Sequence, residues 1–246
     1  MAVVRSGDIR EISRWRRSGF TLVELLVSMA IVGIVLSAIY SLFISQSRTA
    51  SVQGQVVSVQ QNLRAAIYFM EREVRMAGYN PTGVDSGGAG VDIDCDGTDD
   101  PSQDDDSATL MTDESEAFGI KNAQTSTLTF TQDLNGNGDT CDGDESITYA
   151  LNGLMLEKNG TPIAENIEAI YFEYLDAAGT VVTSIGSIRQ VVITVVARTA
   201  RPDADYNDTN GYQSQLGTTV FTVPTGAENY RRRLLSVQVE CRNIGL

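Results

Sequence analysis

The chain contains no histidine, only three cysteines, and 18 basic residues against 32 acidic ones. Without histidine it lacks the commonest general base and the commonest transition-metal ligand of proteins. Catalysis would need a carboxylate pair, a Ser-Lys arrangement or a metal, and acidic runs in loops do not define such a site, so we expect no enzyme. The formal net charge of −14 argues against direct binding to the backbone of nucleic acids.

Charge is also almost absent from residues 20–44, where Glu24 is the only charged side chain. A helix of this length extends about 38 Å, enough to cross a bilayer with some tilt. Five arginines and two acids precede it, a balance that keeps this end cytoplasmic and sends the rest of the chain outward. A lone carboxylate near the end of a membrane helix is costly unless it finds a cationic partner or the interface, which suggests that Glu24 has a function.

The boundary between the basic and apolar segments carries a motif: Gly19, Phe20, Thr21-Leu-Val, Glu24 and then an apolar run. These residues resemble the N-terminal signature of type IV pilins and of the pseudopilins of type II secretion. The resemblance implies that prepilin peptidase cleaves between Gly19 and Phe20, removes the leader 1–19 and methylates the new amino group. The alternative is an ordinary secretory signal peptide, which places its apolar region before the cleavage site instead.

The same resemblance assigns Glu24 to the alignment of subunits during assembly, through an ion pair with the amino group of Phe20 on the same or a neighbouring subunit. The alternative is that Glu24 only extends to the membrane interface. The implied partners are prepilin peptidase, other minor and major pilins, and the inner membrane. We expect a single-pass protein with its head in the periplasm, which later becomes part of a cell-surface pilus.

Beyond the membrane segment, apolar residues continue at intervals of three and four, which predicts an amphipathic helix. Gly78 and Pro81 predict its end. The apolar stripe consists of Val52, Val56, Val59, Leu63, Ile67, Met70, Val74 and Ala77. The predicted parts of the chain are the leader 1–19, a transmembrane half-helix 20–44, an amphipathic half-helix 45–78 and a β-rich head 79–246.

Strand patterns dominate the head, where short runs alternate apolar and polar residues or are rich in β-branched ones. Asn152-Gly153 predicts a hairpin with a type I′ turn. One long N-terminal helix followed by antiparallel strands indicates an α+β fold, and the resemblance implies the type IV pilin-like form in which the helix packs on the sheet. Strands are predicted at 126–131, 147–151, 154–157, 167–175, 191–197 and 235–241.

Softer motifs resemble, within this class, the minor pilins of the PilW kind. They are the run 70–79 that ends in Ala-Gly-Tyr, the hairpin with the strand 167–174, Arg189 before the next strand, and the C-terminal Tyr230-Arg-Arg-Arg and Arg242-Asn243. This resemblance implies a structural subunit that helps prime or cap pilus assembly. The alternatives are a GspJ-like minor pseudopilin of type II secretion and a subunit at the pilus tip that binds a ligand or adheres.

Two acidic loops, 85–106 and 133–146, place oxygen-bearing side chains at alternate positions before a glycine. They resemble DxDxDG calcium loops, because Ca²⁺ takes six to eight oxygen ligands and glycine permits the sharp turn. The alternative is that both are solvated acidic runs. The candidate ligands are Asp92, Asp94, Asp96 and Asp100 in the first loop and Asp133, Asn135, Asn137, Asp139 and Asp144 in the second, where Asp144 falls at position 12.

Each acidic loop contains one cysteine, Cys95 in the first and Cys141 in the second. The outer side of the membrane is oxidising, so a structural disulfide is allowed there. We expect a Cys95–Cys141 bond, which would join two long loops; pairing of either residue with Cys241 is the alternative. Cys241 shares a strand face with Val237 and Val239, as a small buried apolar residue does.

Overall fold

The computed structural model describes residues 19–81, 118–137 and 140–244. The chain divides into two compact units, Met1–Ala50 and Ser51–Leu246. Several predictions fall outside the described residues: the leader up to residue 18, the first acidic loop with Asp92, Asp94, Cys95, Asp96 and Asp100, and Asp139 of the second loop.

Helix α1, Leu22–Val74, is one continuous α-helix of 53 residues. Its extent confirms the long N-terminal helix that the sequence predicts, with ends two or three residues inside the predicted ones. All side chains of residues 19–50 are exposed within the described chain. By length and composition, α1 is suited to cross a membrane.

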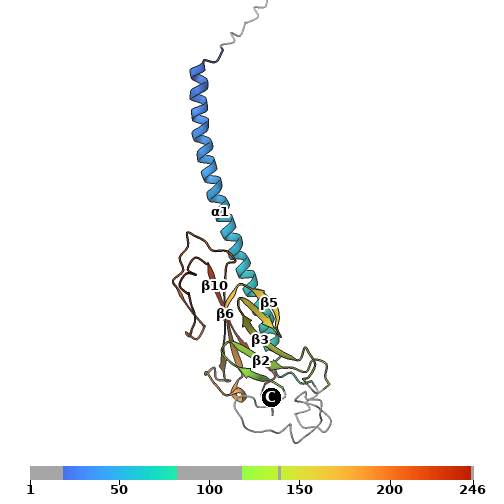
Figure 1. Ribbon diagram of the computed structural model, residues 1–246. Helices are drawn as coiled ribbons and strands as arrows, with labels where there is room; N and C mark the ends of the chain where they lie inside the picture. Colours follow the sequence, from blue (N-terminus) through green and yellow to red (C-terminus); the bar gives the residue numbers. More distant parts are fainter. Residues whose placement is uncertain (1–18, 82–117, 138–139, 245–246) are drawn as a thin grey trace, which may run out of the picture. The chain divides into compact units, whose positions relative to one another are not determined.

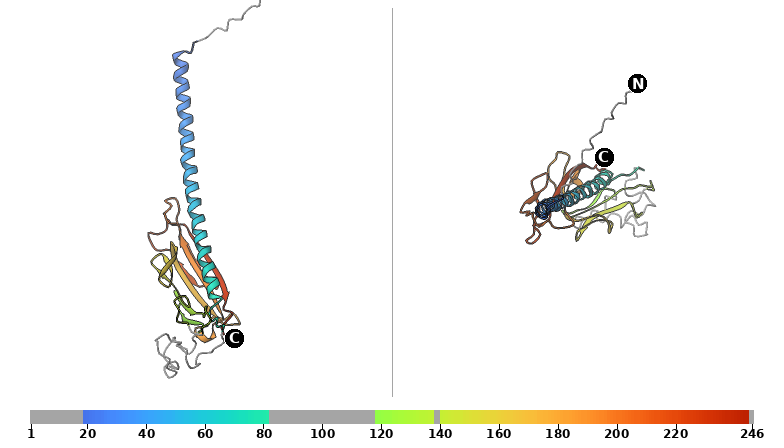
Figure 2. Two further views of the ribbon diagram at one scale, coloured as in Figure 1. Left: turned by 90° about the vertical axis from the view of Figure 1, so that its right-hand side faces the viewer. Right: turned by 90° about the horizontal axis from the view of Figure 1, so that it is seen from above.

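In the second unit, α1 buries the predicted apolar stripe. Val52 and Val56 at its start are half-buried, and the later positions join residues of both larger sheets in one core. Figures 1 and 2 show this part of the helix beside the strands of the head. The buried helix residues are Val59, Leu63, Ala66, Ile67, Met70 and Val74.

The chain leaves the helix at Gly78, as the sequence predicts. Gly78 has a φ of +78°, and its N–H donates to the carbonyl oxygen of Thr131 at 2.9 Å. A Cβ at this position would lie 3.0 Å from the side chain of Ile244 and 3.1 Å from the carbonyl oxygen of Asn243. Both the left-handed conformation and the close approach therefore favour glycine here.

The larger sheet is antiparallel, with its five strands in chain order. The predicted hairpin is confirmed, but its turn differs from the predicted type I′. Asn152 pairs with Met155, so Gly153, with a φ of +61°, is the first of only two loop residues. A lone positive φ at that position is the pattern of a type II′ turn. The strands are β1 (Ile120–Ala123), β2 (Thr127–Thr131), β3 (Ser146–Asn152), β4 (Met155–Lys158) and β5 (Thr161–Glu165).

The second sheet is also antiparallel, in the order β10-β7-β6. β7 is the central strand and is buried at every residue from Val191 to Ala197, which explains its nearly continuous apolar sequence. Its strands are β6 (Ile167–Leu175), β7 (Gln190–Arg198) and β10 (Arg232–Glu240), and a separate pair consists of β8 (Gly211–Gln213) and β9 (Thr219–Thr222), with a 3-10 turn η1 (Ile185–Ser187) before β7.

Local sequence patterns predicted the longer strands of the head and missed most of the short ones. The predicted strands correspond to β2, β3, β4, β6, β7 and β10, whereas β1, β5, β8 and β9 were missed. The missed strands have three to five residues, and β5 contains Pro162, which cannot donate a hydrogen bond to a neighbouring strand. The predicted fold class is confirmed: one long N-terminal helix packs, through its second half, on antiparallel sheets.

Candidate functional site

The start of α1 is a capping box built by Thr21 and Glu24. Oε2 of Glu24 accepts hydrogen bonds from the backbone N–H and the hydroxyl of Thr21, and Oγ1 of Thr21 accepts one from the N–H of Glu24, all at 3.2 Å. N–H groups that the helix itself leaves unpaired are satisfied in this way. The carboxylate predicted to act in assembly therefore also stabilises the first turn, where a negative charge suits the helix dipole.

The two residues of the predicted cleavage site precede this cap. Phe20 is 82% exposed. Apart from its chain neighbours, no atom of the described residues lies within 4 Å of the position that a Cβ on Gly19 would occupy. The described part of the chain therefore sets no steric requirement for glycine at position 19.

Residues 22–44 present an apolar surface on all sides of the helix. Every large apolar side chain from Leu22 to Ile44 is between 36% and 76% exposed. Soluble monomers rarely expose contiguous apolar patches larger than a few hundred Å². Such a surface needs lipid or other helices around it.

Two carboxylates near the ends of the second acidic loop, Asp133 and Glu145, are buried. Oδ1 of Asp133 accepts the N–H of Gly136 at 2.5 Å. Oε1 of Glu145 accepts the N–H groups of Leu134 and Asn135 at 2.8 and 3.2 Å. The other oxygen of Glu145, Oε2, is buried and has no hydrogen-bond partner among the residues that the structure describes.

The remaining predicted ligands of this loop that the structure describes lie at its surface. The amide Nδ2 atoms of Asn135 and Asn137 both approach Oδ2 of Asp142, at 2.5 and 3.5 Å, so these three side chains converge. Asp144 is exposed. Within the described ranges, no three Cys, Asp or Glu side chains are grouped so that they could hold a metal ion. Oxygen ligands here would come from a mixed set of carboxylates, amides and backbone carbonyls.

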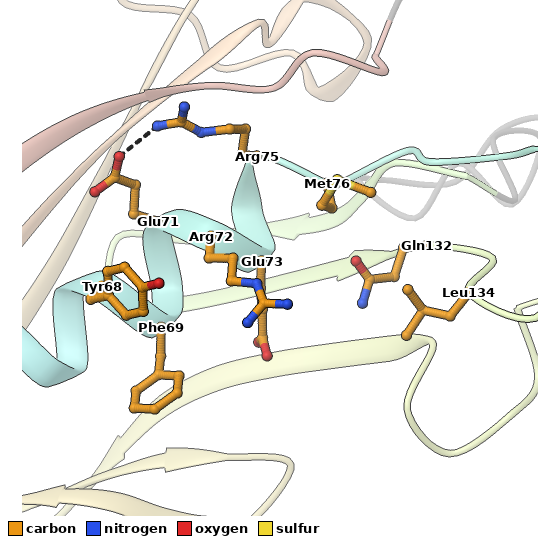
Figure 3. A pocket seen from close by; sticks show the side chains of 9 residues that line it. All are labelled: Tyr68, Phe69, Glu71, Arg72, Glu73, Arg75, Met76, Gln132 and Leu134. Carbon is orange, nitrogen blue, oxygen red and sulfur yellow. Dashed lines mark hydrogen bonds and ion pairs between the residues drawn. The ribbon is translucent and has the colours of Figure 1, made fainter.

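A cavity of about 690 Å³ lies beside the last turns of α1 (Figure 3). Its carboxylates are already engaged: Glu71 pairs with Arg75 at 2.5 Å, and Glu73 pairs with Lys158 at 2.7 Å and accepts the Tyr149 hydroxyl. The contacts of Glu73 therefore tie the end of the helix to β3 and β4. The cavity is lined by Tyr68, Phe69, Glu71, Arg72, Glu73, Arg75, Met76, Gln132 and Leu134.

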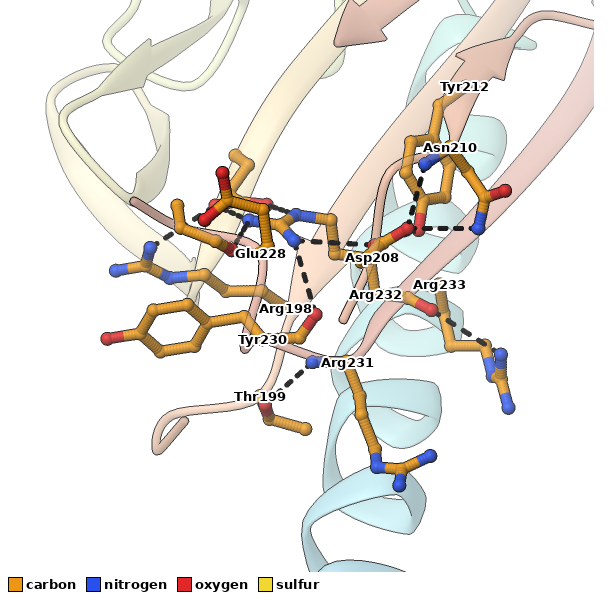
Figure 4. A network of polar contacts seen from close by, with 12 residues as sticks. Arg198, Thr199, Asp208, Asn210, Tyr212, Glu228, Tyr230, Arg231, Arg232 and Arg233 are labelled. Atoms are coloured by element: carbon orange, nitrogen blue, oxygen red, sulfur yellow. Dashed lines mark hydrogen bonds and ion pairs between the residues drawn. The ribbon is translucent and has the colours of Figure 1, made fainter. Parts of the chain in front are cut away.

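The C-terminal arginine run forms a buried charge network (Figure 4). The side chain of Arg232 is fully buried, and its guanidinium donates to Oε2 of Glu168 at 2.5 Å and to Oδ2 of Asp208 at 3.3 Å. Glu168 also pairs with Arg198 at 3.2 Å. The network thus connects β6, β7 and β10 with the segment that carries Asp208.

Asp208 is charged in this network. Burial alone would raise the pKa of Asp208, but hydrogen bonds from the Tyr212 hydroxyl, the Asn210 N–H and Arg232 outweigh it and hold the pKa below its usual value. Hydrogen bonds from several donors thus stabilise the buried negative charge.

Arg198 of this network and the neighbouring Arg231 stack on tyrosines. Arg198 lies 4.1 Å from the centre of the Tyr230 ring and Arg231 lies 4.3 Å from that of Tyr206. Arg231 also pairs with Asp203 at 2.8 Å. The arginine motif noted in the sequence is therefore largely engaged in contacts within the head.

Cys241 is a buried free thiol. Burial raises its pKa to about 12, so the thiol stays protonated and unreactive at neutral pH. This position agrees with the expectation of a small buried apolar residue.

The predictions from the sequence did not include two features of the site. Glu145 was overlooked because loop spacing indicates Asp144, yet Glu145 alternates with Ile147 and Tyr149, which are buried on the same face of β3. The acidic partners of Arg232 lie 64 and 24 residues away in the chain, and local patterns contain no signal for such pairs.

Two family models match this chain. The pattern described as "Prokaryotic N-terminal methylation motif" matches residues 16–40, and the family "Prepilin peptidase-dependent protein B" matches residues 52–216. No curated protein matches the chain. Among solved structures, the type IV-like pilin TTHA1219 from Thermus thermophilus is similar, with 11% identity over 77% of this chain and 100% of that chain and a TM-score of 0.46.

A methylation motif, an apolar N-terminal helix and a head of antiparallel sheets define a type IV pilin-like protein. The family match extends over well more than half of the chain. The chain belongs to the prepilin peptidase-dependent protein B family.

Proposed function

We propose that this protein is a minor type IV pilin of the PilW kind, a structural subunit that helps prime or cap pilus assembly. The observation that carries the proposal is the exposed apolar surface of residues 22–44, which overlaps the methylation motif matched at residues 16–40. Water does not favour such a surface. Lipid covers it in the membrane, and helices of neighbouring subunits cover it in a filament.

In this proposal the protein first sits in the inner membrane with its head in the periplasm. Prepilin peptidase then cuts between Gly19 and Phe20. Among the described residues, nothing lies near the position of a Cβ on Gly19, so we propose that the substrate groove of the peptidase is what requires glycine there. Other minor and major pilins are the partners of the processed chain.

Glu24 has two roles under this proposal, which a pair of variants separates. Glu24→Gln keeps an oxygen for the capping box but loses the charge that would pair with the amino group of Phe20. Thr21→Ala breaks the capping box and keeps the charge. We expect Glu24→Gln to insert and to be processed but to be absent from purified pili, while Thr21→Ala enters them. Normal amounts of Glu24→Gln in pili would contradict the ion-pair role.

Deletion of the gene, with complementation by the unchanged gene, tests the function as a whole. Loss of pili, restored by complementation, is the expected result. Normal pili with lost attachment would instead support the adhesive tip subunit. Normal pili with lost protein secretion would support the GspJ-like pseudopilin.

We also propose that Cys95 and Cys141 form a disulfide. The support is that Cys241 is free and buried in the head, which leaves the two loop cysteines to each other. Peptide mapping without reduction should find one linked peptide pair with these two residues. A linked peptide that contains Cys241 would contradict the pairing.

A further inference from the structure

We propose that the cavity beside the last turns of α1 binds a short extended segment of another protein, in which an acidic side chain lies next to an apolar one. The proposal goes beyond the role in pilus assembly and does not depend on it. Three features of the lining point to this ligand: a buried amide, an arginine and a pair of exposed aromatic rings (Figure 3).

The buried amide of Gln132 is the main observation. Gln132 follows β2, lines the cavity and is only 4% exposed, and Figure 3 shows its amide pointing toward the side of the cavity that α1 forms. This amide has no hydrogen-bond partner among the residues that the structure describes. A buried polar group without a partner is costly, so a ligand that offers one is favoured. Because a primary amide both donates and accepts, it matches the N–H and C=O groups of a peptide backbone.

The charges of the cavity favour an anionic ligand. Glu71 pairs with Arg75 at 2.5 Å, and Glu73 pairs with Lys158 at 2.7 Å. Arg72 is exposed and makes no hydrogen bond or ion pair within the described part of the chain. Its guanidinium presents paired N–H donors in the geometry that a carboxylate accepts. The cavity therefore selects a carboxylate, although the whole chain has a net charge of −14.

Apolar groups line the same cavity as this arginine. Tyr68, Phe69 and Leu134 are each more than half exposed, and the rings of Tyr68 and Phe69 meet edge to face with their centroids 6.1 Å apart. Phe69, Arg72 and Met76 follow one another at intervals of three and four, which places them on one face of α1. Exposed aromatic rings beside an arginine are typical of the residues that dominate binding at protein interfaces.

The size and rigidity of the cavity suit a peptide segment. Its volume of about 690 Å³ is much larger than a carboxylate group alone requires and lies within the range of sites for larger ligands, about 300 to 1,000 Å³. Its walls are also held in place before binding. The N–H of Gln132 donates to the carbonyl oxygen of Glu145 at 2.9 Å, and α1 is fixed by the buried side chains of Met70 and Val74. Binding therefore orders little of the head itself.

The test uses the full chain in non-ionic detergent micelles at about 0.15 M NaCl, which screens the net negative charge. The probes are N-acetylated tripeptide amides in which Asp or Glu lies between two Leu or two Phe residues. Methionine methyl groups labelled with carbon-13 report binding by NMR. The signal of Met76, which lines the cavity, should shift with a Kd of about 0.1 to 1 mM, while that of Met155, on β4 and outside the lining, should not. No shift of Met76 with any probe up to about 10 mM, or an equal shift of Met155, would overturn the proposal.

Two further probes test the chemistry of the ligand. Tripeptides with Asn or Gln in place of the acid lack the charge for Arg72 and should bind about tenfold more weakly. Hexanoate has a carboxylate and an apolar chain but no peptide groups for Gln132, and it should also bind about tenfold more weakly. Equal binding of the neutral tripeptides would contradict the selection of an anion. Equal binding of hexanoate would contradict a peptide ligand and favour a small amphipathic acid.

Arg72→Gln tests the arginine against a matched control. It should weaken the acidic tripeptides about tenfold and remove their advantage over the neutral ones. Arg64→Gln makes the same change of charge at an exposed position roughly two turns earlier on α1, outside the lining, and should change the Kd less than about twofold. Equal losses in the two variants would mean that only the overall charge matters, which would contradict the site.

Gln132→Met tests the buried amide, because it keeps the length of the side chain and removes its polar atoms. Acidic and neutral tripeptides should both bind about three- to tenfold more weakly to this variant. Its thermal midpoint without ligand should be equal or higher, since a buried polar group without a partner is gone. A lower midpoint with unchanged binding would show a purely structural amide and would contradict its role in the site.

Discussion

The two halves of α1 belong to one continuous helix but have opposite surroundings. Residues 22–50 bury no side chain within the described chain, whereas residues 51–74 bury six. The first half is apolar on nearly every side, and the second has an apolar stripe opposite a charged face. A helix that is apolar all round requires a membrane or a large core, whereas a striped one needs a single partner surface. Within the second unit, the head provides that surface for residues 51–74.

This difference means that damage to the head and damage to the first half of α1 should separate experimentally. Variants in the head should lower its stability and leave membrane insertion intact. Variants in residues 22–50 should impair membrane insertion and leave the stability of the head unchanged.

The largest effect on the head is expected from Arg232→Ala. It leaves the carboxylates of Glu168 and Asp208 buried without their main partner, which costs about 3 to 5 kcal/mol of unfolding free energy. Denaturant unfolding in detergent measures the loss. Arg233→Ala, at the exposed next position, should change stability by less than about 0.5 kcal/mol, and similar losses for the two variants would contradict the network.

Met70→Ala should cause the next largest loss of unfolding free energy. Met70 is fully buried against the sheets, so removal of its side chain costs about 2 to 5 kcal/mol, measured in the same unfolding experiment. The neighbour Phe69 is 51% exposed, and Phe69→Ala should cost clearly less. Equal costs would mean that the helix packs on the head through a different face.

Ile34→Arg addresses the first half of α1. An arginine near the middle of a membrane helix costs about 2.5 to 3.5 kcal/mol of insertion free energy. Carbonate extraction of membranes should therefore release more of this variant than of Ile34→Leu, while the melting of the head stays the same. A change in head melting would show that the two halves are not independent.

The acid dependence of the head should be the smallest effect. A hydrogen bond from Arg231 lowers the pKa of Asp203, so the unfolded chain binds a proton more readily than the folded one. The resulting stabilisation is present above the pKa of an unfolded Asp, about 3.9, and is lost as the pH falls through the lower folded pKa. Thermal midpoints taken from neutral pH to about pH 2 should fall less steeply in Arg231→Ala; identical slopes would contradict this role.

The sequence predicted those parts of the fold that repeat at a local period. The stripe from Val59 to Val74, the central strand β7 and the hairpin of β3 and β4 each carry such a pattern within a few residues of chain. The short strands β8 and β9 pair with each other as a local hairpin, but with three and four residues they are too short to show a clear alternation.

For the candidate sites, the sequence was less decisive where one residue can serve two purposes. Thr21-x-x-Glu24 is a capping-box signature, but a lone acid in an apolar run indicates a functional charge just as strongly. In the acidic loop, ligand spacing pointed to Asp144, while strand alternation with Ile147 places Glu145 inside. Which pattern governs a residue becomes clear only when the neighbouring strands are in place.

The account as a whole depends on the exposure of a processed apolar helix to other helices. Mass spectrometry of the N-terminal peptide of the protein isolated from its native membrane or pili tests this most directly. The account predicts a peptide that begins at Phe20 and carries one methyl group on its amino nitrogen. A peptide that begins at Met1, or at any residue other than Phe20, would contradict it.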